Sequence, residues 1–153
     1  MAQKVLIWTV FWLATVSLSD AAPHVTVKGR PADVEPRDAG SQVYHCFGDR
    51  SGEFVLDVQG VTGTRLDVAG RLFQRTRALE APVDGPFEIA DNLGLDETAR
   101  RVVTASIGLP AVKHATSFRV QFLARDHLAE AWQPAGEIAL IVYPSELLCE
   151  VRS

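Results

Sequence analysis

An apolar segment near the carboxyl end of the chain constrains the fold more than any other feature. Six consecutive apolar residues, Ile138 to Tyr143, lie between Gly136 and Pro144, and three of the six are β-branched. A short apolar run with such boundaries favours a fully buried β-strand, covered on both faces, over a short helix. We therefore expect residues 136–143 to form a central strand of the core.

The best partner for this strand is residues 117–123, in which polar and apolar residues alternate. Phe118, Val120 and Phe122 share one face of an extended chain, because successive side chains of a strand point to opposite sides. Other segments alternate or carry β-branched residues in the same manner. They are residues 24–28, 41–47, 53–59, 66–68, 71–79 and 102–107.

Turn signals separate these segments. Residues 48–52 begin and end with glycine and predict a hairpin between the segments on either side. Residues 82–94 are expected to be mostly connection around a short extended segment at 87–89. One or two short helical turns are also expected. The candidates are residues 96–101, residues 125–134 and a turn after Pro144, where Leu147 and Leu148 would cover the core.

About seven short strands with frequent turns predict an all-β fold, a single antiparallel β-sandwich that is immunoglobulin-like in pattern. The likeness is one of pattern only. Antibody-type domains pair cysteines on the second and sixth strands with a tryptophan between them. Here Cys46 fits the second strand, but Cys149 lies beyond the seventh and Trp132 lies in a connector. Such a fold class does not define a function.

Residues 1–21 resemble a secretory signal. Lys4 precedes a nearly unbroken apolar run at residues 5–19, and Ser19 and Ala21 supply small residues at the cleavage point. The alternative is an uncleaved membrane anchor. An anchor usually needs about 20 apolar residues, and the run at residues 5–19 is shorter and ends at the polar pair Ser19 and Asp20. We therefore expect residues 22–153 to form one exported domain, periplasmic or extracellular, without stable insertion in a membrane.

The two cysteines, Cys46 and Cys149, both lie in the exported part. In an oxidising compartment, a pair without metal-type spacing predicts one disulfide bond. Closing so long a loop would contribute about 4–5 kcal/mol to stability. Two free thiols and a bond between chains are the alternatives.

The formal net charge is −4, from 15 basic and 19 acidic residues. It does not change when the signal is removed, because Lys4 and Asp20 leave together. A mildly acidic domain has no long-range attraction for nucleic acid or an anionic membrane. On this basis we expect a protein partner and no nucleic acid.

No pattern in the chain points to catalysis, a cofactor or a metal. A Gly-x-Ser-x-Gly nucleophile elbow is absent, and no two histidines have a close chelating spacing. His45 and Cys46 are neighbours on an expected strand, so they should point to opposite faces and not act on one ion or substrate together. We therefore expect no enzyme activity, no cofactor and no metal site.

Arginines are concentrated in the segment at residues 71–79. If this segment is a strand, Arg71, Arg75 and Arg77 line one face together with Phe73. A row of guanidinium groups could bind carboxylates, sulfate or an acidic partner. The alternative is a solvated face whose charge is balanced by nearby acidic residues, Asp67, Glu80 and Asp84.

These observations favour an exported, non-catalytic module that works through protein contact, such as an accessory or adhesion-like component of an envelope or secreted assembly. The strand at residues 24–28 is the expected edge for adding a partner's strand. A domain that senses a small ligand or anion through the arginine face is the alternative. An enzyme of unknown type is the third hypothesis.

Overall fold

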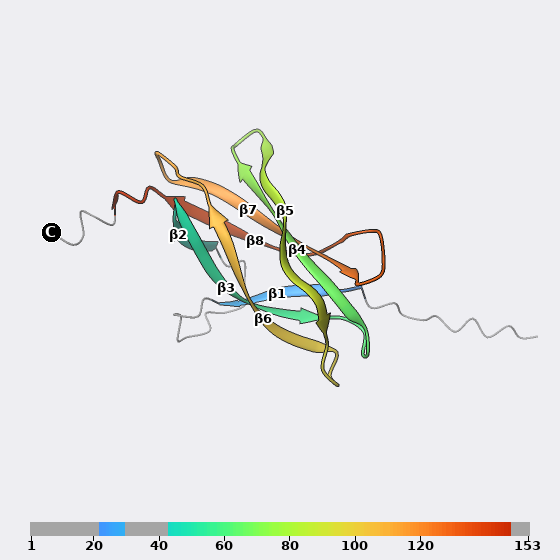
Figure 1. Ribbon diagram of the computed structural model, residues 1–153. Helices are drawn as coiled ribbons and strands as arrows, with labels where there is room; N and C mark the ends of the chain where they lie inside the picture. Colours follow the sequence, from blue (N-terminus) through green and yellow to red (C-terminus); the bar gives the residue numbers. More distant parts are fainter. Residues whose placement is uncertain (1–21, 30–42, 148–153) are drawn as a thin grey trace, which may run out of the picture.

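The computed structural model describes residues 22–29 and 43–147, which form two β-sheets packed face to face (Figure 1). The strands are β1 (His24–Gly29), β2 (Val43–Phe47), β3 (Arg50–Gln59), β4 (Arg65–Arg75), β5 (Glu80–Gly94), β6 (Arg100–Leu109), β7 (Thr116–Asp126) and β8 (Gln133–Tyr143). The smaller sheet has the order β1-β3-β6 and the larger has the order β2-β8-β7-β4-β5. The predicted all-β sandwich is confirmed.

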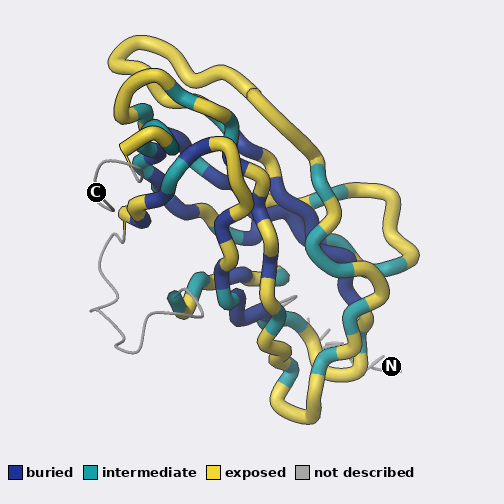
Figure 2. The backbone as a smooth tube through the Cα atoms, turned by 60° about the vertical axis from the view of Figure 1, so that its left-hand side comes forward, coloured by how far each residue is buried: buried dark blue, intermediate teal, exposed yellow. Residues whose placement is uncertain are grey.

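The core lies between the two sheets and is built from alternate residues of each strand. Phe54, Leu56 and Val58 of β3 face Phe118 and other apolar residues of β7, and all are buried. Figure 2 shows buried backbone running along the packed strands, while the connecting loops are exposed. Each such side chain contributes about 1.5–3 kcal/mol by leaving water, so the alternation seen in the sequence sets the orientation of these strands.

The apolar run at 138–143 forms β8, which lies between β2 and β7 in the larger sheet. Leu140 and Val142 point into the core and are buried. Ala139 and Ile141 are only half-buried on the outer face. The expectation of a strand buried on both faces is therefore wrong for one face, which is apolar and yet accessible.

The predicted hairpin at residues 48–52 is wrong. β2 pairs in parallel with β8, from Val43 opposite Ala139 to Phe47 opposite Tyr143, whereas β3 belongs to the other sheet. The backbone of Asp49 has a positive φ of 57°, and the chain crosses between the sheets there. Both arrangements bury the same alternate residues, so alternation alone does not distinguish them.

The region from residue 65 to residue 94 also differs from the prediction. β4 runs without interruption through Gly70, and β5 is a strand of 15 residues where mostly connection was expected. A β-carbon at Gly70 would lie 2.5 Å from ring atoms of Phe87. The glycine therefore makes room for Phe87 of β5 and does not break β4.

The helical turns predicted at 96–101 and 125–134 are not formed. Asp96 instead holds a turn, because its carboxylate accepts hydrogen bonds from the backbone N–H groups of Thr98 (2.8 Å) and Arg100 (3.0 Å). Leu128 is 94% exposed and does not cover the core. Within the described ranges no helix is long and apolar enough to span a membrane. The predicted signal at 1–21 and Leu148 lie outside the described residues.

Candidate functional site

A β-sandwich has open sheet edges, and a further strand can pair with such an edge. The edges are β1 and β6 in the smaller sheet and β2 and β5 in the larger sheet. An edge strand can accept a partner only where its outward N–H and C=O groups are accessible and regularly spaced.

The edge strand expected from the sequence, β1, is closed by β8. Its free side brings the backbone carbonyl of Val25 against Gly136, in the space that a β-carbon at residue 136 would fill. The register of β1 with β3 also shifts between Val27 and Gly29. A partner's strand therefore has no clear approach to β1.

The edge formed by β5 is irregular. Its register with β4 shifts at four places, and the strand contains Pro82 and a cis bond between Gly85 and Pro86. Proline has no N–H to donate, and register shifts break the regular spacing that a new strand needs. These features protect this edge from pairing.

β6 is different, because all ten of its residues pair with β3 in one unbroken register. The direction of its backbone groups follows from a hydrogen bond just beyond the paired region, from Gly60 N–H to Ala99 C=O at 3.0 Å. In an antiparallel pair, hydrogen-bonded and non-hydrogen-bonded residue pairs alternate. The odd-numbered residues of β6 therefore bond to β3, and the even-numbered residues direct N–H and C=O outward.

Four outward residues form what we call the β6 edge: Val102, Thr104, Ser106 and Gly108. All four are exposed, and a β-carbon at Gly108 would have nothing within 4 Å. Within the described part of the chain, no strand pairs with this side of β6. The edge ends at Arg100, whose N–H and C=O bond to Asp96.

An ion pair between the buried carboxylate of Asp57 and the exposed side chain of Arg100 fixes the start of β6 to β3. Asp57 is 2% exposed on the outer face of the smaller sheet and contacts Arg100, with the Arg100 Nε at 3.3 Å. Lys28 Nζ of β1 lies 3.6 Å from the same carboxylate. The hydrogen bond from Arg100 lowers the pKa of Asp57 against the opposing effect of burial. This contact links the three strands of the sheet.

The structure separates the arginines that the sequence placed in one row. Arg71 and Arg75 lie on β4, but Arg77 lies in the turn after it. Arg75 and Arg77 line one groove on the outer face of the larger sheet, and Arg71 is not among its lining residues. Their role in ligand binding stays a prediction.

Arg119 of β7 supplies a further guanidinium on the same sheet, but its donors are occupied. Glu80 accepts bonds of 2.7 Å from both Nε and Nη2, and Glu137 accepts one of 2.9 Å from Nη1. The guanidinium carbon lies 4.7 Å from the centre of the Phe73 ring. Arg119 is therefore a structural cation that is already neutralised.

The structure also contains a polar cluster around Asp67 that was not predicted from the sequence. Asp67 is 3% exposed on the outer side of β4, 3.0 Å from Arg125 Nε and 2.7 Å from His127 Nδ1. The Asn92 N–H donates to it at 3.0 Å, and Asp91 approaches His127 at 3.6 Å. Burial would raise the pKa of Asp67, but the bonds from Asn92, His127 and Arg125 outweigh it and lower the value to about 2.

The donor set of this cluster, Asp67, Asp91 and His127, is of a kind that binds metal ions. Arg125 already neutralises Asp67, however, and both carboxylate oxygens of Asp67 accept hydrogen bonds. The contacts fit a structural ion-pair network that joins β4, β5 and the end of β7. Only the fold brings together residues that are 60 positions apart, so no local pattern could have indicated the cluster.

The predicted disulfide is not tested, because Cys149 lies outside the described residues. Cys46 is 2% exposed and points into the core from β2, whereas its neighbour His45 is exposed on the outer face. The expectation that these two residues point to opposite faces is therefore confirmed. The bond between Cys46 and Cys149 stays a prediction.

Comparisons with known proteins give one structural likeness to report. No protein-family model and no curated protein matches the sequence. The fold is similar to that of the Pseudomonas fluorescens alkylpurine DNA glycosylase AlkC bound to DNA containing an abasic site analog, with a TM-score of 0.47 and 10% sequence identity. The match covers 79% of this chain and 30% of that chain. At these values, it assigns no function to this chain.

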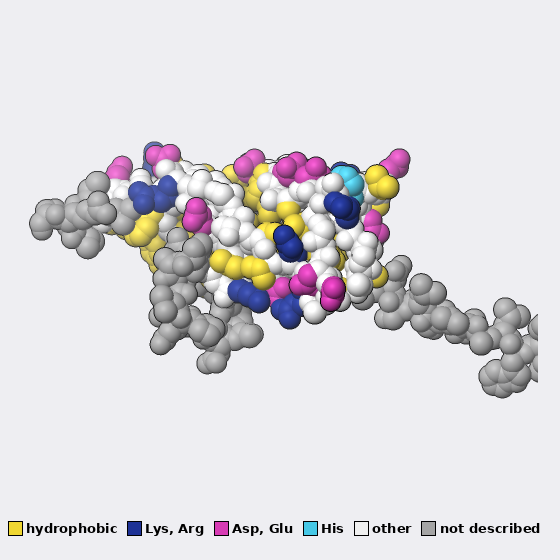
Figure 3. Space-filling model, turned by 60° about the horizontal axis from the view of Figure 1, so that its bottom comes forward, with side chains coloured by type: hydrophobic (Ala, Val, Ile, Leu, Met, Phe, Trp, Pro, Cys, Tyr) yellow, Lys and Arg dark blue, Asp and Glu magenta, His cyan; other side chains and the backbone are white. Residues whose placement is uncertain are grey.

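This finding corrects one expectation, namely that nucleic acid is not a partner. The similar structure is that of a protein bound to DNA. The exclusion rested on net charge alone, which is an average over the molecule. In the view of Figure 3, basic and acidic side chains are interspersed over the surface. Nucleic acid is therefore no longer excluded.

Proposed function

We propose that this chain is an exported, non-catalytic β-sandwich module that binds a partner protein by adding one of the partner's strands to the β6 edge. The observation that carries the proposal is the accessible and regular row of outward backbone groups at Val102, Thr104, Ser106 and Gly108. The apolar segment at residues 5–19 motivates the export.

The side chains of the β6 edge favour a strand over other ligands. They are small or β-branched and carry no charge from Val102 to Leu109, so a partner's backbone can approach to the usual strand spacing of about 4.8 Å. Charged side chains, proline and bulges normally protect an edge, and this part of β6 has none of them. Main-chain hydrogen bonds would supply affinity, and the partner's alternate side chains would supply specificity.

The sandwich type supports the same proposal. We infer an immunoglobulin-like arrangement, in which β1, β3 and β6 correspond to strands A, B and E, and β4, β7 and β8 to strands C, F and G. In the antibody constant-type sandwich, strand D pairs with strand E. Here β5 instead joins the larger sheet beside β4. The position of strand D beside β6 is the one that a partner's strand would fill.

The proposal is tested with a substitution that removes one outward N–H. Thr104→Pro deletes that donor, and proline is tolerated at an edge where the N–H faces solvent. Thr104→Val changes the same side chain and keeps the N–H, so it is the matched control. Both variants are expressed in the native host with the signal and are crosslinked in the cell.

We expect a partner that crosslinks to the wild-type protein and to Thr104→Val but is lost with Thr104→Pro. The crosslink should lie within residues 100–109. Equal crosslinking of the two variants, or crosslinks only at β1 or β5, would overturn the assignment. Melting curves of the purified variants establish that both are folded.

A further inference from the structure

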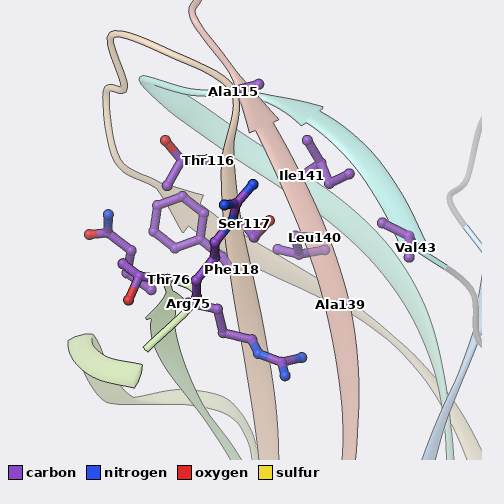
Figure 4. Close-up of a pocket in the computed structure, with 12 residues that line it drawn as sticks. Val43, Arg75, Thr76, Ala115, Thr116, Ser117, Phe118, Ala139, Leu140 and Ile141 are labelled. Atoms are coloured by element: carbon purple, nitrogen blue, oxygen red, sulfur yellow. The ribbon is translucent and has the colours of Figure 1, made fainter. Parts of the chain in front are cut away.

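The outer face of the larger sheet contains a groove of about 580 Å³ that the proposed strand contact does not use. Figure 4 shows its setting, with Arg75 and Thr76 on one side and Val43 on the other, across β7 and β8. The groove is lined by Val43, Gln74, Arg75, Thr76, Arg77, Ala115, Thr116, Ser117, Phe118, Ala139, Leu140 and Ile141. Its size is in the range of small-molecule sites, about 300–1,000 Å³.

Among the described residues that line the groove, the charged ones are the two cations Arg75 and Arg77. Arg75 Nε lies 3.9 Å from Glu80, beyond hydrogen-bond distance. Arg77 forms no ion pair with any described residue. Glu80 accepts its two short hydrogen bonds from Arg119, so both groove arginines keep donors for a ligand. Arginine donors suit a carboxylate, because their spacing matches its two oxygens.

The opposite side of the groove is apolar. Val43 of β2 is 44% exposed and lies directly across from Ala139 of β8, and Ile141 is the next outward residue of β8. Ala139 and Ile141 are the aliphatic residues of the run at 138–143 that the core does not fully bury. An apolar surface beside two available cations suits a ligand that has both an anionic group and a hydrocarbon part.

We propose that this groove binds a small organic carboxylate with a short hydrocarbon chain. The carboxylate lies on Arg75 and Arg77, and the chain covers Val43, Ala139 and Ile141. The site is on the larger sheet and the β6 edge is on the smaller one, so this proposal does not depend on the strand contact. It places the ligand-binding arginines at 75 and 77, without 71.

Sodium octanoate is a suitable probe, because it has one carboxylate and an unbranched apolar chain. The mature protein, labelled with nitrogen-15, is titrated with octanoate while its amide spectrum is recorded. We expect saturable shifts at residues 115–117 and 139–141, with binding in the millimolar range. Acetate tests whether the chain contributes, and octylammonium tests whether the charge does. Both should bind at least about tenfold more weakly, because each lacks one of the two contacts.

Variants assign the contacts. Arg75→Gln combined with Arg77→Gln should weaken octanoate binding at least about tenfold, and Arg71→Gln is the matched control that should leave it unchanged. If the double variant does not fold, Arg77→Gln alone is used, because no described residue forms an ion pair with Arg77. Octanoate binding that survives the loss of both arginines, that octylammonium reproduces, or that is absent at 20 mM (about the upper limit of a useful weak site) overturns the proposal.

Discussion

The backbone carbonyl of Val25 in β1 lies against Gly136 in β8, in the space where any other residue at position 136 would place its β-carbon. This contact brings an edge of the smaller sheet onto the larger sheet and closes the sandwich on that side. It explains why β1, the edge expected from the sequence, is not the accessible one. The opposite edge of the smaller sheet, β6, has no such cover within the described residues.

The contact predicts the effect of adding a methyl group at residue 136. Gly136→Ala should lower the free energy of unfolding by about 1–3 kcal/mol, because the β-carbon would overlap backbone atoms of Val25. Urea unfolding measures the change. Gly108→Ala is the control, since a β-carbon there meets nothing within 4 Å, and we expect its stability to be unchanged or slightly higher. Equal stability of Gly136→Ala and the wild type would mean that β1 and β8 are not in contact in solution.

Most of the extended segments, with the exception of β5, could be predicted from alternation, but their sheet partners could not. Alternation buries Tyr44 and Cys46 whether β2 pairs with β3 or with β8. The glycine at 70 indicates a break unless the distant Phe87 is known to pack over it. Local patterns report which face of a strand is apolar, while strand pairing depends on contacts between residues far apart in the chain.

The candidate sites were predictable to a still smaller extent. The prediction of a row of arginines on one strand required the strand to continue to Leu79. In the structure β4 ends at Arg75, and Arg77 lies in a turn. The β6 edge became apparent only when the strand order and the hydrogen-bond alternation were known. The composition of residues 102–109 is that of an ordinary buried or half-buried strand.

The Asp67 cluster predicts a specific loss of stability in acid. The pKa of Asp67 is lowered from 3.8 to about 2 in the folded protein, so the ionised carboxylate stabilises the fold above about pH 4 and that stabilisation is lost as the pH falls toward 2. A shift of this size corresponds to roughly 2 kcal/mol. Asp67→Asn should lower the stability by a similar amount at pH 6 and differ little from the wild type near pH 2.

Urea unfolding of both proteins at several pH values between 6 and 2 measures this difference. Other carboxylates with lowered pKa values, among them Asp57, titrate in both proteins and cancel. Glu53→Gln serves as the control, because Glu53 is exposed on β3, outside the Asp67 cluster, and its loss should change the stability by less than about 0.5 kcal/mol. If the difference in the free energy of unfolding between the wild type and Asp67→Asn did not change with pH, the role given to this carboxylate would be contradicted.

The last prediction concerns the backbone of β6 in the isolated protein. Amide hydrogens of Val103, Ala105 and Ile107 bond to β3 and should exchange slowly with solvent, while those of Thr104 and Ser106 should exchange much faster. Hydrogen exchange followed by NMR distinguishes neighbouring amides and therefore reads this alternation directly. Slow exchange at every residue of β6 in a dilute monomer would mean that another segment of the chain already pairs with the edge, and the proposed strand contact would then have no accessible site.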